Sequence, residues 1–394
     1  MAGPLSHITV LDLSRVLAGP WAGQNLADLG AEVIKVERPV KGDDSRAYGP
    51  PYLKDREGRE TSEAAYFLAA NRGKKSIAID LADPKGQEIV RALAANCDVL
   101  IENYKVGDLA RYGLGYEHIK AVNPGIVYCS VTGFGQTGPA KERPGYDFMV
   151  QGMSGLMSIT GLPDSEPGGG PLRFGVPIID IMTGMYASIA ICAALTHRAK
   201  TGVGQYIDVA LLDTAMALTS ISGMSYLTSG EVPERIGNTH AAIVPYQVFR
   251  TADGHIILAC GNDNLFQKFC AAAGCVGYAG DVRFLKNSDR VKNRSLLEPL
   301  LAAVFVTRTT REWTAVLEAA GVANGPINTI GEAFAEEQTK ARHTQQSLPH
   351  PLAGSAPMIA SPMKFSATPI EYFRSAPMLG EHQDEILARI KKVR

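Results

Sequence analysis

The feature that most restricts the fold is a regular alternation of β-branched segments and helical segments near the start of the chain. Residues 7–13 (HITVLDL) are typical of a strand, and residues 31–39 (AEVIKVERP) are typical of a second one. Between them, residues 20–30 suit a helix with Pro20 in its first turn and Gly30 as its stop. A strand, a helix and a strand in this order predict two parallel strands joined by a right-handed crossover.

The alternation continues through the first half of the chain. Further strands are predicted at 75–81, 98–103 and 125–135, with a helix at 83–97 that Asp83 caps. Two apolar helices near 146–159 and 181–199 follow, and residues 204–220 suit a strand that leads into a helix. This order predicts an α/β fold: a large, Rossmann-like, doubly wound domain whose first part covers residues 1–224.

The pattern changes after residue 224. Residues 246–261 alternate as two strands do, with Asp253-Gly254 as the hairpin turn between them, and helices are predicted near 263–273, 294–305 and 310–320. These elements predict a smaller α+β domain over residues 225–339. Residues 336–343 and the closing segment suit helices, and residues 362–369 suit an extended stretch.

Composition argues against several classes of partner. The net charge is −1, so no overall field draws the protein to nucleic acid or to a membrane surface. The uncharged run from Ile181 to Thr196 is shorter than a bilayer requires and suits a buried helix. The first residues lack the pattern of a secretory signal, and the six cysteines form no CxxC pair. We therefore expect reduced thiols, a cytoplasmic location and no metal site.

Asp180 is the residue whose position most needs an explanation. It lies among Ile178, Ile179 and Ile181, and a buried carboxylate without a partner costs several kcal/mol. If the helix at 181–199 begins there, Asp180 is its cap or lies in its first turn, where the helix dipole favours the anion. The residues alone leave two interpretations open: a structural cap, which is the more common case, or a permanently ionised nucleophile aimed at an acyl carbon.

Other candidate sites give weaker signals. The first strand–helix turn lacks the GxGxxG spacing of a dinucleotide site, and the chain has no GxSxG motif. Basic residues recur near predicted strand ends and suit either a phosphorylated ligand or a solvated surface, of which the surface is favoured: Arg15, Arg38, Arg72, Lys74 and Lys75. His240 is the one histidine placed near a site, although a core histidine is more common.

Several segments together resemble the class III CoA-transferases, the family that includes formyl-CoA transferase and carnitine CoA-transferase. The resemblance runs along nearly the whole chain, and its strongest segments are VLDLSRVLAGPWAGQNLADLGAEVIKVERP, NRGKKSIAIDL, NPGIVYCSVTGFGQTGP, DIMTGMYASIAICAALTHRAKTGVGQYIDVAL and LGEHQDEIL. It implies an interlocked homodimer in which each chain threads through a ring formed by the other. It also implies a large domain built from both ends of the chain, so that residues 340–394 return to this domain.

The resemblance implies that Asp180, which precedes Thr183-Gly184, is the catalytic residue. Its carboxylate would attack a donor acyl-CoA and give an aspartyl–acyl anhydride, which CoA thiolate would convert into an aspartyl-CoA thioester. An acceptor carboxylate would then attack, and CoA would pass to the new acyl group. CoA is thus a substrate, and no permanently bound cofactor is expected.

The resemblance also implies a set of CoA contacts. In the family, Arg38 and Arg111 would meet phosphates, residues 79–81 would flank the adenine, and Tyr146 and Asp147 would lie near the pantetheine end. The full set is Val16, Leu17, Ala18, Arg38, Ile79, Asp80, Leu81, Asn103, Tyr104, Lys105, Arg111, Arg143, Tyr146 and Asp147. Arg143 belongs to it because Pro144 stands where some members carry a lysine.

One difference from the family narrows the range of acids that the protein is expected to use. Formyl-CoA transferase carries a glycine-rich loop in the region where this chain reads GNTHAAIVPYQ, which argues against oxalate and formate as substrates. Dicarboxylic acids such as succinate, glutarate, hydroxymethylglutarate or itaconate fit better, and Arg15, Arg173 and His240 are the candidates for binding a second carboxylate.

Two alternatives remain. One is an α-methylacyl-CoA racemase, which would need a histidine where this chain has Tyr146. The other is a CoA-binding protein without catalysis, in which Asp180 is a plain helix cap.

Overall fold

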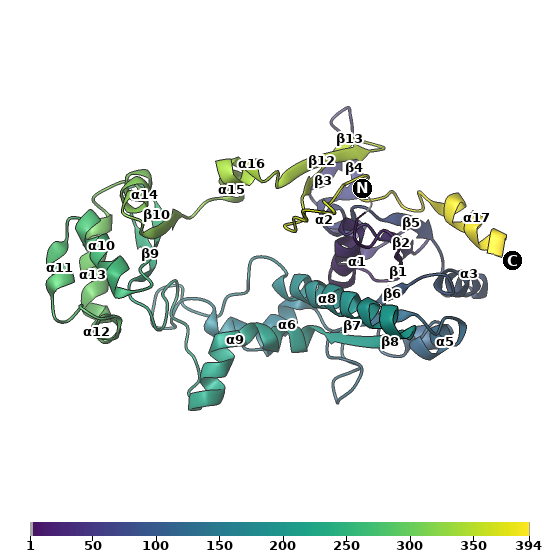
Figure 1. The fold of residues 1–394 in the computed structure, drawn as a ribbon, viewed down its shortest axis with the longest axis horizontal. Helices are drawn as coiled ribbons and strands as arrows, with labels where there is room; N and C mark the ends of the chain where they lie inside the picture. Colours follow the sequence, from purple (N-terminus) through teal and green to yellow (C-terminus); the bar gives the residue numbers. More distant parts are fainter. Residues whose placement is uncertain (1–2, 394) are drawn as a thin grey trace. The chain divides into compact units, whose positions relative to one another are not determined.

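The structure is a computed structural model that describes residues 3–393, and the chain divides into two compact units (Figure 1). Unit 1 contains the chain up to Leu156, Arg173–Gly230, and the segment from Glu337 onward. Unit 2 contains Met157–Leu172 and Glu231–Glu336. The sequence did not indicate that Met157–Leu172 groups with the second unit.

Unit 1 is built on a six-stranded parallel sheet, as the alternating pattern predicted. The strand order is β5 (Lys75–Ala78), β2 (Glu32–Glu37), β1 (Thr9–Asp12), β6 (Val99–Glu102), β7 (Val127–Thr132) and β8 (Gln205–Ala210). The predicted parallel pair is confirmed, with Thr9 opposite Glu32 and Asp12 opposite Lys35. Because the chain moves outward from β1 in one direction and from β6 in the other, the topological switch point lies between these two strands. A parallel sheet opens a ligand crevice at the carboxyl ends of its strands there.

Helices cover both faces of this sheet, and alternate residues of each strand face opposite cores. Val10 of β1 packs into one core with α1 (Ala18–Asp28), α8 (Ile178–Thr201) and α9 (Leu211–Ser229). Leu11 packs into the other core with α3 (Pro84–Ala94), α5 (Tyr116–Val122) and α17 (Gln383–Val393). Because both faces of the sheet are covered, nearly all residues of β1, β2 and β7 are buried, and these include the charged residues Asp12, Lys35 and Glu37.

The remaining elements of unit 1 are short. They are η1 (Asp44–Ala47), β3 (Tyr52–Lys54), β4 (Glu60–Ala64), α2 (Ala65–Asn71), α4 (Asp108–Arg111), α6 (Asp147–Met153), α16 (Glu337–Ala341), β12 (Gln345–His350) and β13 (Gly354–Ile359).

Three local predictions for unit 1 need correction. The helix expected over 146–159 is two helices, α6 and α7 (Leu156–Ile159), because Gly155 between them has a φ of 85°. The helix expected from 181 begins at Ile178. Residues 362–369 form no strand, and the hairpin β12–β13 precedes them.

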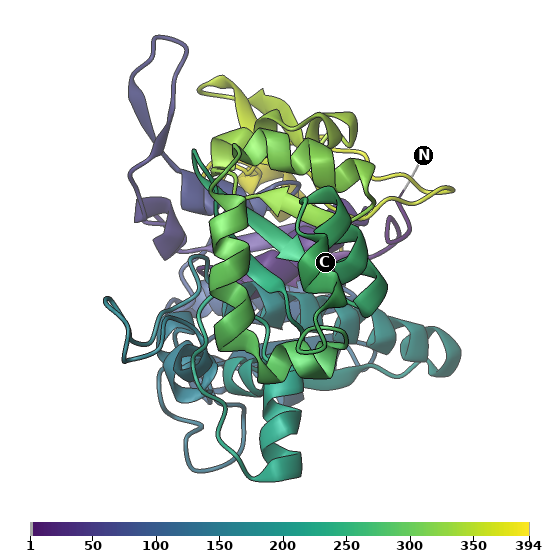
Figure 2. The same ribbon diagram turned by 90° about the vertical axis from the view of Figure 1, so that its left-hand side faces the viewer.

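Unit 2 is a small α+β unit around a three-stranded antiparallel sheet, with its helices beside the sheet (Figure 2). The predicted hairpin is confirmed as β9 (Tyr246–Arg250) and β10 (His255–Ala259), which also pairs with β11 (Ala323–Pro326). Its helices are α10 (Asp263–Ala272), α11 (Val276–Gly280), α12 (Asn287–Lys292), α13 (Arg294–Phe305), α14 (Thr310–Ala319) and α15 (Ile330–Ala335). Phe249, Phe269, Phe305 and Trp313 are fully or almost fully buried in its core.

Helix α8 is long and apolar enough to cross a bilayer by length and composition, the one such helix in residues 3–393. It packs against α1 and lies over β7 and β8, so much of its apolar surface has a partner within unit 1. Its first turn carries Asp180 to the carboxyl end of the sheet.

Candidate active site

A cavity of about 290 Å³ lies in unit 1 at the predicted switch point. The turn after β1 supplies Arg15–Ala18 and the segment after β6 supplies Asn103–Val106. The chain after β7 supplies Thr132, Gly133 and the segment 141–146, and Asp180 reaches the cavity from α8. The structure thus brings these predicted site residues to one cavity: Arg15, Val16, Leu17, Ala18, Asn103, Tyr104, Lys105, Arg143, Tyr146 and Asp180.

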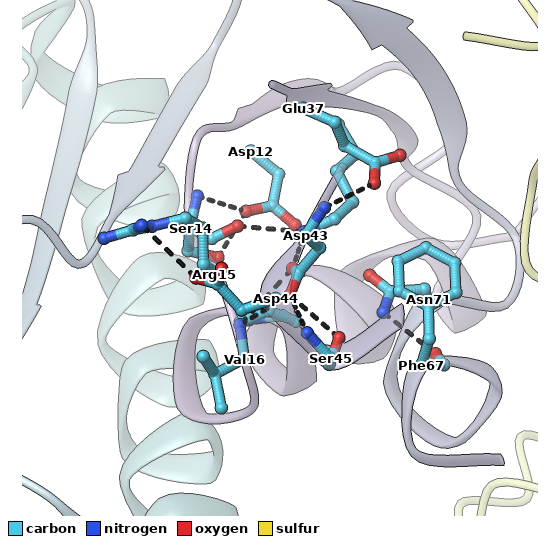
Figure 3. A network of polar contacts seen from close by, with 12 residues as sticks. Asp12, Ser14, Arg15, Val16, Glu37, Asp43, Asp44, Ser45, Phe67 and Asn71 are labelled. Carbon is cyan, nitrogen blue, oxygen red and sulfur yellow. Dashed lines mark hydrogen bonds and ion pairs between the residues drawn. The ribbon is translucent and has the colours of Figure 1, made fainter. Parts of the chain in front are cut away.

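The turn between β1 and α1 is held in a strained conformation. Val16 has a φ of 69°, which a β-branched residue rarely adopts. Its N–H group donates to both carboxylate oxygens of Asp43, at 3.1 and 3.3 Å (Figure 3). The side chain of Asn103 fixes the preceding residue, because it accepts from the Arg15 N–H at 2.8 Å and donates to the Arg15 carbonyl at 2.7 Å. Strain held by several contacts is typical of functional sites.

A buried network of ion pairs and hydrogen bonds supports this turn (Figure 3). Lys35 Nζ lies 2.8 Å from Asp43 Oδ2 and also donates to the Ser14 carbonyl at 2.9 Å. Burial alone would raise the pKa of Asp43, but the charge of Lys35 and the hydrogen bonds from Lys35 and Ser45 together outweigh it and lower the pKa to about 2. Asp43 is therefore a fixed anion, and the turn is tied to the centre of the sheet.

Three cations for which the sequence favoured a solvated surface over a ligand site are part of the buried scaffold instead. Lys74 is fully buried and lies 2.8 Å from Asp12, and burial lowers its pKa to about 8. Arg72 pairs with Asp28 at 2.6 Å, and Lys75 pairs with Glu32 at 2.6 Å. The reason is topological: Arg72 and Lys74 precede β5 and Lys75 is its first residue, whereas the cavity lies at the carboxyl ends of the strands.

Asp180 lies in the first turn of α8, but it is not the cap of that helix. Asp147, from the start of α6, takes that role: its Oδ2 accepts from the N–H groups of Ile179 at 2.7 Å and of Asp180 at 3.1 Å. Within residues 3–393 no group donates a hydrogen bond to the Asp180 carboxylate, which is half-buried and lines the cavity. The interpretation of Asp180 as a structural cap is therefore wrong.

The expected permanent charge on Asp180 also needs correction. Burial and, after it, the negative charge of Asp147 raise the pKa of Asp180 to about 7. The helix N–H groups that would have favoured the anion are occupied by Asp147. Asp180 therefore ionises well above the pH range of an exposed aspartate, as is typical of a reactive carboxyl group rather than a structural one.

A second cavity, of about 200 Å³, adjoins the first one. It contains the predicted residues Arg38 and Ile79–Leu81, and it shares Arg15 and Tyr104 with the Asp180 cavity. The guanidinium of Arg15 lies 4.8 Å from the centre of the Tyr104 ring. Asp44 pairs with both Arg15 and Arg38, so the two guanidinium groups converge where the cavities meet. This arrangement suits a long ligand with anionic groups.

Four predicted site residues do not line either cavity. Arg111 pairs with Asp108, and Asp147 is buried behind Asp180. Arg173 lies 5.4 Å from the centre of the Phe148 ring. His240 belongs to unit 2, where its ring contacts Tyr246.

The sequence missed several cavity residues, among them Asp44, Tyr48, Lys141 and Glu142. Lys141 could have been found, because it stands beside Arg143 on the loop after β7. Lys105, Lys141 and Arg143 line the cavity without an ion-pair partner in the described part of the chain, so they can meet an anionic ligand.

Comparisons with known proteins agree with this geometry. The model of the CoA-transferase family III matches residues 5–383. The succinate–glutarate CoA-transferase of Agrobacterium fabrum is 47% identical over 390 residues, which cover 99% of this chain and 96% of that protein. The human succinyl-CoA:glutarate CoA-transferase is 42% identical over 387 residues, which cover 98% of this chain and 86% of that protein. A crystal structure of a CAIB/BAIF family protein from Brucella suis matches with a TM-score of 0.88 and 46% identity, covering 99% of this chain and 100% of that one.

Proposed function

The chain belongs to CoA-transferase family III, and from this membership we propose that it transfers CoA from succinyl-CoA to glutarate or a closely similar dicarboxylate. As a member of this family it is an enzyme that uses CoA thioesters and carboxylic acids as substrates. One observation carries the mechanistic part of the proposal. The Asp180 carboxylate lies in a cavity at the switch point with no hydrogen-bond donor among residues 3–393.

In the proposed reaction, ionised Asp180 attacks the thioester carbon of succinyl-CoA. The C–S bond breaks, CoA leaves as a thiolate, and a mixed aspartyl–succinyl anhydride forms. The thiolate then attacks the aspartyl carbonyl, which gives an aspartyl-CoA thioester and releases succinate. Glutarate attacks this thioester and again displaces the thiolate. The thiolate attacks the glutaryl carbonyl of the new anhydride, and glutaryl-CoA and free Asp180 are formed.

The cations of the two cavities support binding of the anionic substrates. Arg38, in the second cavity, suits the CoA phosphates. Lys105, Lys141 and Arg143 offset the negative charge of the thiolate and the carboxylates around Asp180. For the second carboxylate of the acceptor, Arg15 is the candidate with most support, because Arg173 and His240 do not line the Asp180 cavity.

We further propose an interlocked homodimer in the cytoplasm. The family resemblance supports the dimer. The cysteines support a reducing compartment, since all six are free and Cys97, Cys129, Cys260 and Cys270 are buried.

The test is a transfer assay with succinyl-CoA and a panel of free acids, read by mass spectrometry. We expect CoA products from glutarate, hydroxymethylglutarate or itaconate, and none from oxalate or formate. Asp180→Asn should abolish transfer but retain CoA binding. The matched control is Asp213→Asn, which changes an exposed aspartate at the same position in the first turn of α9 and should stay active.

Hydroxylamine trapping during turnover should modify one acidic side chain, Asp180. Transfer that survives in Asp180→Asn, or the absence of any dicarboxylate product from the wild-type protein, would refute the proposal.

A further inference from the structure

We propose that Asp147 is a positioning residue, which caps α8 from outside and thereby leaves the Asp180 carboxylate free of hydrogen-bond donors in the cavity. The family resemblance had suggested a contact between Asp147 and CoA. The structure instead places Asp147 behind the reactive carboxylate, buried and outside the cavity lining. This inference rests on the proposed function, because it concerns how Asp180 is prepared for attack.

Both oxygens of Asp147 are occupied within unit 1. Oδ2 accepts from the N–H groups of Ile179 and Asp180, and Oδ1 accepts from Gln151 Nε2 at 2.5 Å. The carbonyl oxygen of the Gln151 side chain accepts in turn from the Phe174 N–H at 2.8 Å. Asp147 therefore cannot turn toward the cavity without breaking these bonds. The same chain of contacts fixes the segment that enters α8.

The position of Asp147 decides what Asp180 can bind. The first N–H groups of a helix have no partner in the helix and would otherwise attract a carboxylate of the first turn. Because Asp147 fills this place, Asp180 loses those donors and faces the cavity beside a fixed negative charge. A carboxylate in this state is less stabilised as an anion and is the better nucleophile once it is ionised.

Other groups around Asp180 contribute to its environment. The hydroxyl groups of the cavity lining belong to Tyr48, Tyr104, Thr132 and Tyr146, and Tyr66 lies close enough for the charge of Asp180 to raise its pKa. The other charged groups of the cavity are the cations of Arg15, Lys105, Lys141 and Arg143 and the carboxylates of Asp44 and Glu142. Of all these charges, Asp147 is the one that raises the pKa of Asp180.

The test compares the pH dependence of kcat/KM for acyl-CoA in the wild-type protein and in Asp147→Asn. Asparagine retains an oxygen that can accept the helix N–H groups but removes the charge. Activity should rise with pH near 7 in the wild-type protein, as Asp180 ionises, and this rise should move about one pH unit lower in Asp147→Asn. KM for acyl-CoA should change little, because Asp147 does not line the cavity. Asp147→Ser also removes the charge, should move the rise in the same direction, and serves if the asparagine variant does not fold.

The matched control is Asp253→Asn in unit 2. Asp253 also caps a helix from outside, since its Oδ1 accepts from the Thr310 N–H at 2.8 Å at the start of α14. This variant should keep the wild-type pH profile. An unshifted profile in the Asp147 variants, or an equal shift in Asp253→Asn, overturns the inference while the proposed function stands. A wild-type protein without transfer activity overturns both.

Discussion

At the scale of single residues, Asp180 combines reactivity with a cost in stability. Its pKa in the folded protein is about 7, above the value near 4 of an exposed aspartate. The folded state therefore binds this proton more tightly than the unfolded chain does. The contribution to stability is complete below about pH 4 and is lost as the pH rises through 7.

This cost predicts that Asp180→Asn, which we expect to be inactive, is more stable than the wild-type protein at pH 8. Asparagine resembles the protonated form and has no charge to bury. We expect a gain of about 2–4 kcal/mol in the free energy of unfolding at pH 8, and almost none at pH 4. Urea unfolding of both proteins at the two pH values measures this difference in the free energy of unfolding. A variant that is equally stable or less stable at pH 8 would show that burying the charge of Asp180 does not destabilise the protein.

The sequence identified Asp180 as the candidate catalytic residue but did not predict its environment. Its place in a first helical turn could be read from the apolar run that follows it, and the resemblance marked it as catalytic. The cap could not be predicted, because Asp147 is 33 positions away and no local pattern couples it to α8. The charge state was wrong for the same reason, since it depends on which carboxylate takes the free N–H groups.

At the scale of elements, the turn between β1 and α1 depends on the buried pair Lys35–Asp43. Lys35→Met should leave the Asp43 carboxylate buried without its cation and destabilise the protein by about 3–5 kcal/mol. It should also weaken CoA binding, because Asp43 holds Val16 in its strained conformation. Chemical unfolding and CoA titration measure the two effects. Lys75→Met removes a more exposed lysine of the same sheet and should cost less than about 1 kcal/mol.

The loop after β7 is closed at its base by two glycines. A Cβ atom on Gly145 would lie 2.2 Å from the Gly133 Cα, so any side chain there must push the two strands of the loop apart. Gly145→Ala should displace Lys141 and Arg143 and raise KM for acyl-CoA several-fold, with a smaller change in kcat. Gly277→Ala, at a helical glycine with open space around it, is the control and should leave both constants unchanged. An unchanged KM in Gly145→Ala would mean that this loop does not contact CoA.

The elements themselves were predictable to different degrees. The central strands and α1, α3 and α8 followed from apolar periodicity, because both faces of the sheet are buried. The hairpins β3–β4 and β12–β13 were missed, since their sequences are polar or contain proline and lack the alternation of a half-buried strand. Their pairing depends on tertiary contacts that a local pattern does not contain.

At the scale of the whole molecule, unit 1 is assembled from three separate parts of the chain. The closing segment packs against the first half of the chain: the His382 N–H donates to the Ser76 carbonyl at 3.0 Å, and Arg389 pairs with Glu32 at 2.6 Å. The sequence indicated this return only through the family resemblance. Contacts between residues so far apart leave no periodic signal in either segment.

The chain on its own leaves large apolar side chains uncovered. On α8 and α9, Ile189 is 62% exposed, Leu227 is 75% exposed and Ile221 is 80% exposed. Soluble proteins seldom expose such side chains in groups, and a net charge of −1 gives little repulsion between copies. A second copy of the chain is the partner that the family resemblance suggests for these surfaces.

The interlocked dimer makes a prediction that an ordinary dimer does not. Light scattering should give twice the chain mass of 42.1 kDa at all accessible concentrations. When tagged and untagged proteins are mixed under native conditions, they should not form mixed dimers, because separation requires each chain to leave the ring of the other. Mixed dimers should appear after joint unfolding and refolding, which is the positive control. A monomeric mass would exclude any dimer. Mixed dimers that form within hours without denaturant would exclude interlocking, and an ordinary contact between the α8 and α9 surfaces would then be sufficient.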